Sequence, residues 1–269
     1  MLGLPEIELP EGTLSGLKAF QSQVNCGADF PAQVALAKSI FARMNKSNNS
    51  IFRVVREHLT AICNGHGRCC YCELSLPDEV EHVRPKDLYP EVAFVWENYV
   101  YACGICNGTW KSNKFAVIAK DGSLCDVTRA QKSPVVPPVD GHPALINPRL
   151  EDTLLLLELD LVDTFLFLPR AASGTAEYVR AAYTIQLLGL NKRPILPRAR
   201  ANAFGAYRAR LTEYRNKRDA GTSPRSLSEL RLDLLASPHP FVWREMQRQP
   251  EVRDDIAQLF EEVPEANRW

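Results

Sequence analysis

The chain lacks any long hydrophobic run. No apolar stretch approaches the eighteen or more residues that a membrane-spanning helix needs, and the first ten residues, M-L-G-L-P-E-I-E-L-P, have neither the basic nor the apolar segment of a signal peptide. The sequence also lacks a G-x-x-x-x-G-K-[ST] motif, which excludes a P-loop for ATP phosphates. The lack of a long hydrophobic run and of a signal peptide predicts a cytoplasmic protein without a membrane span.

The chain also lacks a net charge, because 32 Lys and Arg residues balance 32 Asp and Glu residues. A neutral total at first argues against a nucleic-acid partner. The charge is unevenly distributed, however, since residues 191–231 contain eleven basic and three acidic side chains. Such an excess can neutralise several phosphates, and an ordinary solvated helix face is the alternative. The basic residues are Lys192, Arg193, Arg198, Arg200, Arg208, Arg210, Arg215, Lys217, Arg218, Arg225 and Arg231.

Cysteine is present in a metal-binding pattern. Two C-x-x-C pairs stand thirty residues apart, and each pair can present two thiolates to one ion from a single tight turn. The predicted tetrahedral Zn²⁺ ligands are Cys69, Cys72, Cys103 and Cys106. Cys70 is a poor alternative ligand, because one residue between Cys70 and Cys72 is too short a spacing for both to bind one ion. Cys26, Cys63, Cys70 and Cys125 are expected to be free, buried thiols. The spacer is longer than that of a simple zinc ribbon, so other residues are inserted between the pairs.

The inserted segment contains a second pattern. It has E-H-V-R-P at residues 81–85 and W-E-N at residues 96–98, and the second cysteine pair continues as C-G-I-C-N at residues 103–107. These motifs resemble the HNH, or ββα-metal, endonucleases, in the variant in which asparagine replaces the last histidine. The resemblance covers Cys69 to about Phe115. It implies a β-hairpin followed by a helix, with zinc holding the two ends together.

The resemblance implies roles in phosphodiester hydrolysis for four residues. His82 is suited to be the general base, since a neutral imidazole can take a proton from water near pH 7. Glu81 and Asn107 offer oxygen ligands, which suit Mg²⁺ or Mn²⁺. Asn98 would hold the hairpin loop and orient His82. The alternatives are a purely structural zinc clip with Glu81 and His82 on the surface, and a plain turn role for Asn98.

Four basic side chains near these motifs are candidates for contacting nucleic-acid phosphate: Arg84, Lys86, Lys111 and Lys114. In the family a lysine commonly comes three residues after the final His or Asn. Here Lys111 comes four residues after Asn107, which puts its role in doubt. A solvated surface is the alternative for all four residues.

The predicted fold class is α+β and mostly α-helical, with a zinc-stapled ββα-metal core and flanking helices. We expect an N-terminal arm and helix over residues 1–50, the nuclease core over 51–132, a Pro-rich linker over 133–150 and an α-rich domain over 151–269. Residues 1–30 show little periodicity and are expected to be extended. Helical spacing then predicts a helix that begins at Pro31 and a second from Ile51 to Cys63, which ends at Asn64-Gly65.

In the C-terminal half, apolar runs at 154–159 and 164–168 predict a short β-hairpin, and residues 176–188 predict a helix that Gly189 ends. A long basic helix is expected from Pro197 through Arg218. It carries a stripe of Phe204, Tyr207, Leu211 and Tyr214. Core packing of this stripe is the favoured interpretation, and base stacking is the alternative.

A second resemblance extends beyond the core. I-N-P-R-L at 146–150 and A-A-Y-T-I-Q-L-L-G-L-N at 181–191, together with the core motifs, resemble the HNH proteins of Septu-type and retron-linked anti-phage systems over most of residues 51–220. The resemblance implies an ABC-type or SMC-like ATPase partner, which must be another polypeptide because this chain has no P-loop.

The function predicted from both resemblances is a metal-dependent endonuclease that acts in defence, with DNA as the favoured substrate and tRNA as the alternative. A stand-alone restriction or nicking enzyme and a non-catalytic, zinc-stapled module that binds nucleic acid or protein are the competing hypotheses.

Overall fold

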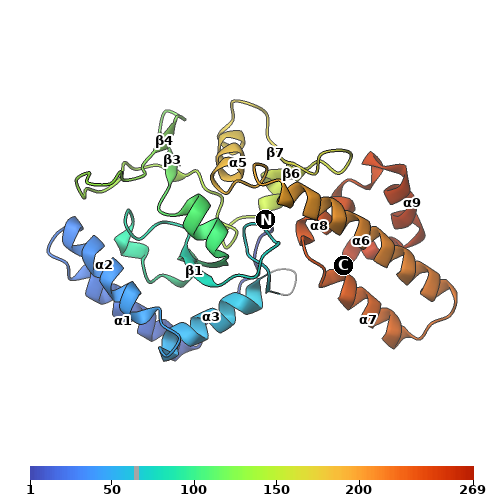
Figure 1. The fold of residues 1–269 in the computed structure, drawn as a ribbon, viewed down its shortest axis with the longest axis horizontal. Helices are drawn as coiled ribbons and strands as arrows, with labels where there is room; N and C mark the ends of the chain where they lie inside the picture. The colour runs from blue at the N-terminus through green and yellow to red at the C-terminus, as the bar shows by residue number, and fades with distance from the viewer. Residues whose placement is uncertain (64–66) are drawn as a thin grey trace.

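The structure is a computed structural model that describes residues 1–63 and 67–269. The predicted helix end at Asn64-Gly65 therefore lies outside the described residues. The chain folds into an α+β structure in which helices predominate and the sheets are small. Helices α1 to α3 lie on one side of the central small sheets, and α6 to α9 lie on the other (Figure 1).

Three N-terminal helices form the first flank: α1 (Glu11–Asn25), α2 (Phe30–Met44) and α3 (Ser50–Ile62). Helices α2 and α3 begin where short polar side chains cap them. Asp29 accepts a hydrogen bond from the backbone N–H of Ala32, and Asn49 accepts one from that of Phe52. These two helices confirm the sequence prediction.

Helix α1 corrects the expectation of an extended N-terminal arm, because residues 11–25 are helical. Gly12 and Gly16 lower the intrinsic helix propensity of this segment, so its sequence shows little helical signal. Tertiary packing supplies the missing stability, since Leu17 and Val24 are buried in the core. Gly16 also permits a close approach to α3, where a Cβ atom would collide with Ile51.

The segment with the HNH-like motifs forms a two-stranded antiparallel sheet and a helical turn. Strand β1 (Glu79–His82) pairs with β2 (Tyr99–Ala102). The two 3₁₀ turns η1 (Pro90–Val92) and η2 (Trp96–Asn98) lie in the connection between them. The π-helical segment η3 (Ile105–Lys111) follows β2 almost directly.

Two further small sheets follow η3. Strand β3 (Ala116–Ile118) pairs with both β4 (Leu124–Asp126) and β5 (His142–Pro143). Strand β6 (Leu157–Leu159) pairs with β7 (Phe167–Pro169), which confirms the predicted hairpin with shorter strands. The three-stranded sheet was not predicted, because strands of two or three residues are too short to show alternation.

The C-terminal half contains α5 (Ala176–Leu187), α6 (Ile195–Asp219), α7 (Pro224–Leu235), α8 (Pro240–Arg248) and α9 (Asp254–Glu262). Helices α5 and α6 confirm the two predicted helices. The short 3₁₀ turns of this half are η4 (Thr153–Leu155), η5 (Pro250–Val252) and η6 (Pro264–Arg268). No described helix combines the length and the apolar character needed to cross a membrane.

The stripe on α6 belongs to the hydrophobic core. Phe204, Tyr207 and Leu211 are buried, and Tyr207 stacks on Trp243 of α8 with 5.5 Å between ring centroids. Tyr214 is partly buried and contacts Trp269. The interpretation of the stripe as core packing is therefore confirmed.

The basic charge of α6 is partly neutralised within the chain. Three ion pairs join Arg208 to Asp255, Arg215 to Glu262 and Arg218 to Glu265. The two residues of every pair are 47 positions apart in sequence. Because this separation stays constant along α6, α6 runs parallel to the segment that contains α9 and η6. Such half-exposed pairs stabilise weakly, by about 0–1 kcal/mol each. They nevertheless reduce the positive charge that α6 could offer to a polyanion.

Candidate metal and catalytic site

The four predicted zinc ligands meet in space. The Sγ atoms of Cys69, Cys72, Cys103 and Cys106 lie within 4.8 Å of one another, and all four residues are buried. A tetrahedral site with Zn–S bonds of about 2.3 Å requires sulfur separations of about 3.8 Å. The Sγ atoms of Cys72 and Cys103 are 4.0 Å apart, which matches this requirement. The cluster therefore fits a structural zinc ion.

The cluster also has the hydrogen-bond donors that zinc-bound thiolates need. The backbone N–H of Cys103 donates to Cys69 Sγ at 3.3 Å, and Arg193 Nη2 donates to Cys106 Sγ at 3.4 Å. Donors of this kind stabilise the negative charge on the sulfur atoms and orient the ligands. Because Arg193 follows α5, the C-terminal half of the chain contacts the cluster directly.

Glu73, which follows Cys72, is a structural residue that the sequence did not reveal. Its side chain is 2% exposed, and its carboxylate accepts hydrogen bonds from the backbone N–H groups of Leu2 at 2.8 Å and Phe241 at 3.3 Å. It thereby links the first cysteine pair to the N-terminal segment and to α8. Both partners are distant in sequence, so no local pattern signals this role.

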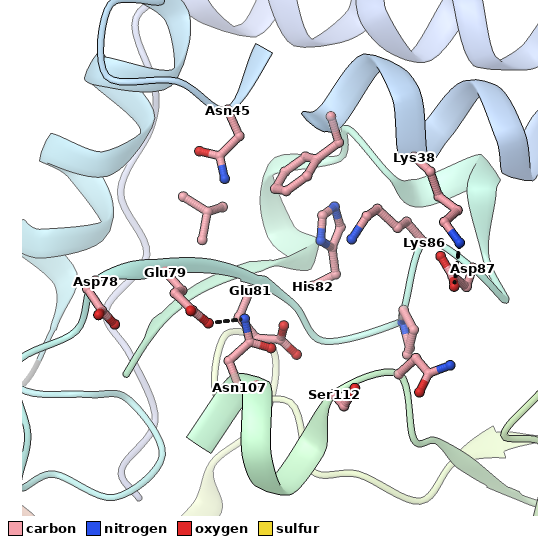
Figure 2. Close-up of a pocket in the computed structure, with 15 residues that line it drawn as sticks. Lys38, Asn45, Asp78, Glu79, Glu81, His82, Lys86, Asp87, Asn107 and Ser112 are labelled. Carbon is pink, nitrogen blue, oxygen red and sulfur yellow. Dashed lines mark hydrogen bonds and ion pairs between the residues drawn. The ribbon is translucent and has the colours of Figure 1, made fainter. Parts of the chain in front are cut away.

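A cavity of about 520 Å³ lies beside β1, α2 and η3 (Figure 2). It brings together three of the four predicted catalytic residues, namely Glu81, His82 and Asn107, with the predicted phosphate contact Lys86. Its wall also contains Glu79 and Lys38, which the sequence analysis did not single out. Asp78, Glu79 and Glu81 lie on the side of Asn107 (Figure 2). Lys38 and Lys86 lie on the other side of His82, where Lys38 forms an ion pair with Asp87 at 3.2 Å.

His82 ends β1 with its ring fixed in one orientation. Its Nε2 atom lies 2.9 Å from the carbonyl oxygen of Ala93, and Phe41 and Tyr99 pack edge to face against the ring. A carbonyl oxygen only accepts, so Nε2 carries a proton and the neutral ring keeps its lone pair on Nδ1. Burial, with a further contribution from Lys86, lowers the pKa of His82 well below its ordinary value. The neutral, basic form is therefore the stable one near pH 7.

Glu81 is paired with an internal cation. Its carboxylate forms an ion pair with Lys111 of η3, and both side chains are buried. Lys111 Nζ also donates to the carbonyl oxygen of His82 at 2.8 Å. Burial raises the pKa of Glu81, and the nearby Lys111 opposes this shift. The pair places a positive charge directly beside the proposed metal ligand.

Asn107 has its amide orientation set by Glu79. The Nδ2 atom of Asn107 donates to Glu79 Oε2 at 2.7 Å, which leaves the amide oxygen Oδ1 available as a ligand (Figure 2). Among the described residues, only the four cysteines form a group of three or more acidic, His or Cys ligands close enough to share an ion. A hard cation at Glu81 and Asn107 would therefore take most of its oxygens from phosphate and water, as Mg²⁺ usually does. The donor chemistry fits such an ion.

Asn98 organises the connection between β1 and β2. Its Oδ1 accepts from the backbone N–H of Arg84 at 2.8 Å, and its Nδ2 donates to the carbonyl oxygens of Arg84 and Val92, each at 3.0 Å. The side-chain amide does not bond to His82, whose ring is held by Ala93 instead. Any effect of Asn98 on His82 is therefore transmitted through the backbone of the loop.

The four candidate phosphate-binding residues lie in different places. Lys86 lines the cavity, with its Nζ atom 4.8 Å from the centre of the Phe41 ring. Arg84 lies over Tyr89 outside this cavity, and Lys114 donates to the carbonyl oxygen of Trp110 on an exposed surface. Lys111 is fully buried, so it does not lie on the surface where a phosphate backbone would pass.

The π-helical geometry of η3 explains how Lys111 reaches Glu81 despite its unusual spacing. The N–H of Ser112 bonds to the carbonyl oxygen of Asn107, five residues earlier, at 2.5 Å. A π-helix has more residues per turn than an α-helix, so one extra residue fits within the turn. The position four residues after Asn107 therefore faces the site more nearly as position three would in an α-helix. The sequence spacing alone could not show this compensation.

Replacing Lys111 with methionine should destabilise the metal-free protein by about 3–5 kcal/mol, because Glu81 would be left buried without its partner. Addition of Mg²⁺ should recover part of this loss if the ion takes the place of the ammonium group. The measurement is the free energy of unfolding in denaturant, without and with added Mg²⁺, in buffer free of chelator so that the structural zinc is kept.

The matched control is Lys114→Met, which removes an exposed lysine from the same region and should change stability by no more than about 0.5 kcal/mol. Equal stability of the two variants without Mg²⁺ would contradict the buried Glu81–Lys111 pair.

Comparison with known proteins gives one informative similarity. The chain matches no protein family model. An alignment over 145 residues, which covers 48% of the chain, is 28% identical to Septu protein PtuB of Bacillus thuringiensis. The match covers 51% of that protein, so the similarity spans about half the length of each.

Proposed function

We propose that this protein is a metal-dependent endonuclease of the HNH, or ββα-metal, type that hydrolyses phosphodiester bonds in nucleic acid. The observation that carries the proposal is the placement of His82, with an available ring nitrogen, in one cavity with Glu81 and Asn107. The β1–β2 pair and η3 supply these residues, and the four-cysteine cluster ties the ends of this segment together. This is the order of parts expected of a ββα-metal core.

In the proposed reaction, His82 removes a proton from the attacking water through Nδ1. As the ring becomes positive, its Nε2–H bond to the Ala93 carbonyl becomes stronger, because hydrogen bonds from charged donors are stronger than neutral ones. Burial keeps the ring neutral before the reaction, which is the state that a base requires. The packing of Phe41 and Tyr99 prevents the ring from turning away.

Glu81 and Asn107 are the proposed ligands of Mg²⁺ or Mn²⁺. A bound ion of this kind stabilises negative charge on the scissile phosphate and on the leaving oxygen. Lys111 contacts Oε1 of Glu81, so the other carboxylate oxygen can hold the ion while the ion pair is kept. Lys86 is the proposed phosphate contact, because its ammonium group lies at the cavity beside His82. Asn98 is proposed to hold the loop that carries the backbone partner of His82 in place.

The similarity to a Septu protein supports a role in anti-phage defence. We propose that the chain works in the cytoplasm with a separate ABC-type or SMC-like ATPase, which restrains or activates cleavage. DNA is the favoured substrate, and tRNA is the alternative. The ββα-metal core contacts mainly backbone phosphate, so the site geometry does not distinguish the two by base readout.

The decisive experiment incubates the purified protein, alone and with any ATPase encoded by a neighbouring gene, with plasmid DNA and with total tRNA. Each mixture is tested with Mg²⁺, with Mn²⁺ and with EDTA. We expect cleavage of one substrate class that requires the divalent ion and that the ATPase modulates. Zinc content is measured in parallel, so that a misfolded preparation is recognised.

The outcomes separate the competing hypotheses. Metal-dependent cleavage that is indifferent to the ATPase would favour a stand-alone restriction or nicking enzyme. A protein with full zinc content that binds nucleic acid but cleaves neither substrate, with or without the ATPase, would contradict catalysis and favour a zinc-stapled binding module.

A further inference from the structure

A second cavity, of about 560 Å³, lies on the other side of η3 from the proposed catalytic site. It is bounded by the end of η3, by β3 and β4, and by α5. Figure 1 shows α5 beside β3 and β4, along one edge of the molecule. The lining includes three aromatic side chains, two lysines and an amide: Trp110, Tyr178, Tyr183, Lys114, Lys192 and Gln186. The proposed catalysis uses none of the six.

The floor of this cavity is well packed. Val179 and Tyr183 of α5 pack against a small apolar cluster that consists of Ala116, Ile118 and Ala144. This cluster joins α5 to the three-stranded sheet, so the aromatic side chains of α5 project from a fixed surface. The lysines and Gln186 are exposed at the rim, where they can reach a bound molecule.

Trp110 is held in place from the C-terminal half of the chain. Gly189 lies so close to the indole ring that a Cβ atom there would come within 2.5 Å of it, and the backbone φ of +59° also favours glycine. The guanidinium group of Arg193 lies over the same indole, 5.8 Å from its centre. A fixed aromatic wall of this kind loses little conformational freedom when a flat ligand stacks on it.

The two cavities share η3 as a common wall. Asn107 lines the first cavity and Trp110 lines the second, and both residues belong to η3. They lie three positions apart in sequence but face opposite sides of η3. A helix with its side chains is about 10–12 Å across, and a stacked strand advances about 3.4 Å per nucleotide. A strand that passes η3 with its phosphate in the first cavity can therefore place a nucleotide a few positions away in the second.

Apart from the carboxylate of Asp126, the lining matches the chemistry of an unpaired nucleotide. Aromatic rings stack on the face of any base, lysines neutralise phosphate, and an amide can donate to and accept from a base edge. A base inside a duplex is already stacked and paired, so it must leave the helix before it can enter such a pocket. A base in a bulge, loop or single strand is already free to do so.

We propose that this second cavity binds an unpaired nucleotide of the nucleic acid that is cut, close to the cleavage position. The inference rests on the proposed nuclease function and deepens it, because it names the substrate class: a duplex interrupted by an unpaired nucleotide, or a looped strand. Tyr178 and Tyr183 stack on the base, while Lys114 and Lys192 hold its flanking phosphates.

Binding is tested with the full-length chain in buffer that contains no Mg²⁺ or Mn²⁺ and no chelator, so that cleavage does not occur and the structural zinc is kept. Fluorescence anisotropy compares labelled hairpins that carry a single-nucleotide bulge with fully paired hairpins of the same length, as DNA and as RNA. We expect the bulged form of at least one sugar type to bind about tenfold more tightly, which is the scale of one stacked base. Equal affinity for bulged and paired forms of both DNA and RNA would overturn the proposal.

The double variant Tyr178→Ala/Lys192→Ala should remove the preference for the bulge while affinity for the paired hairpin falls by no more than about threefold, because loss of one phosphate contact weakens binding to all sequences alike. Lys120→Ala is the matched control, since this exposed lysine near the β3–β4 turn is not part of the cavity. Retention of the bulge preference in the double variant would also overturn the proposal.

A direct probe of stacking is 2-aminopurine at the bulged position. Its fluorescence should be quenched on binding to the native chain and to Lys120→Ala, and the quenching should be lost in Tyr178→Ala. Because these measurements need no catalysis, they can fail while the cleavage experiment succeeds. The failure of the subsite and the failure of the nuclease proposal are therefore distinguishable.

Discussion

Replacement of His82 with alanine should reduce the rate of nucleic-acid cleavage by about 10² to 10⁴-fold, the usual contribution of a positioned general base. The reason is that Nδ1 of His82 is the basic atom that the cavity presents beside Glu81 and Asn107. Glu81 and Asn107 remain in this variant, so binding of the divalent ion should be retained. The rate is measured under single-turnover conditions with saturating Mg²⁺.

The control must show that the loss is chemical and not a consequence of unfolding. His82 is buried against Phe41 and Tyr99, so its removal leaves a cavity that lowers stability. His82→Asn is a second variant that fills more of this space and cannot act as a base. His142→Ala removes an exposed histidine and should leave the rate unchanged.

Two results would each contradict the role of His82. One is a rate within about fivefold of the native rate for a folded His82→Asn protein, because a catalytic base contributes far more. The other is an equal loss in His142→Ala, which would indicate a general effect of histidine removal.

The sequence predicted the cysteine cluster because metal ligation needs only the identity and spacing of its ligands. Two C-x-x-C pairs imply a shared ion even though the residues between them are unknown. The same reasoning predicted helices α2, α3, α5 and α6, in which periodic apolar residues and polar caps are local signals. These helices depend on neighbours within a few turns of the chain.

The features that the sequence did not reveal depend on distant partners. Glu79 accepts a hydrogen bond from the side chain of Asn107, and Glu73 accepts hydrogen bonds from the backbone of Leu2 and Phe241. The partners in each pair are far apart in sequence, so they form no short motif. Helix α1 has two glycines and is stabilised mainly by its neighbours. In each case tertiary contacts outweigh local propensity.

The charge of α6 shows that a count of basic residues in the sequence does not reveal which of them are paired. Eleven basic residues in one region indicate a polyanion site only if acidic residues of the same chain do not pair with them. In the structure Arg208, Arg215 and Arg218 pair with acidic residues 47 positions later. The candidate nucleic-acid contacts with the best geometric support are instead those at the two cavities beside η3.

Loss of the structural zinc ion should unfold the segment that contains the proposed catalytic site. The four cysteines join the beginning of the β1–β2 segment to η3, and η3 carries both Asn107 and Lys111. Structural zinc sites contribute folding free energy outright, with apparent values of about 10–16 kcal/mol in small zinc-binding peptides. We expect the native chain to contain about one zinc per molecule, and Cys106→Ser to lose it with a large fall in thermal stability.

Two matched variants make this prediction specific. Cys26→Ser removes an exposed thiol, and Cys70→Ser removes a buried thiol that lies between two proposed ligands without joining the cluster. Both variants should retain zinc, measured by elemental analysis of the purified protein, although Cys70→Ser should lose some stability through burial of a hydroxyl group.

Zinc loss in Cys70→Ser together with full zinc content in Cys69→Ser would contradict the assignment of the ligands. Full zinc content and native stability in Cys106→Ser would contradict the cluster itself, because three thiolates alone do not close a structural zinc site.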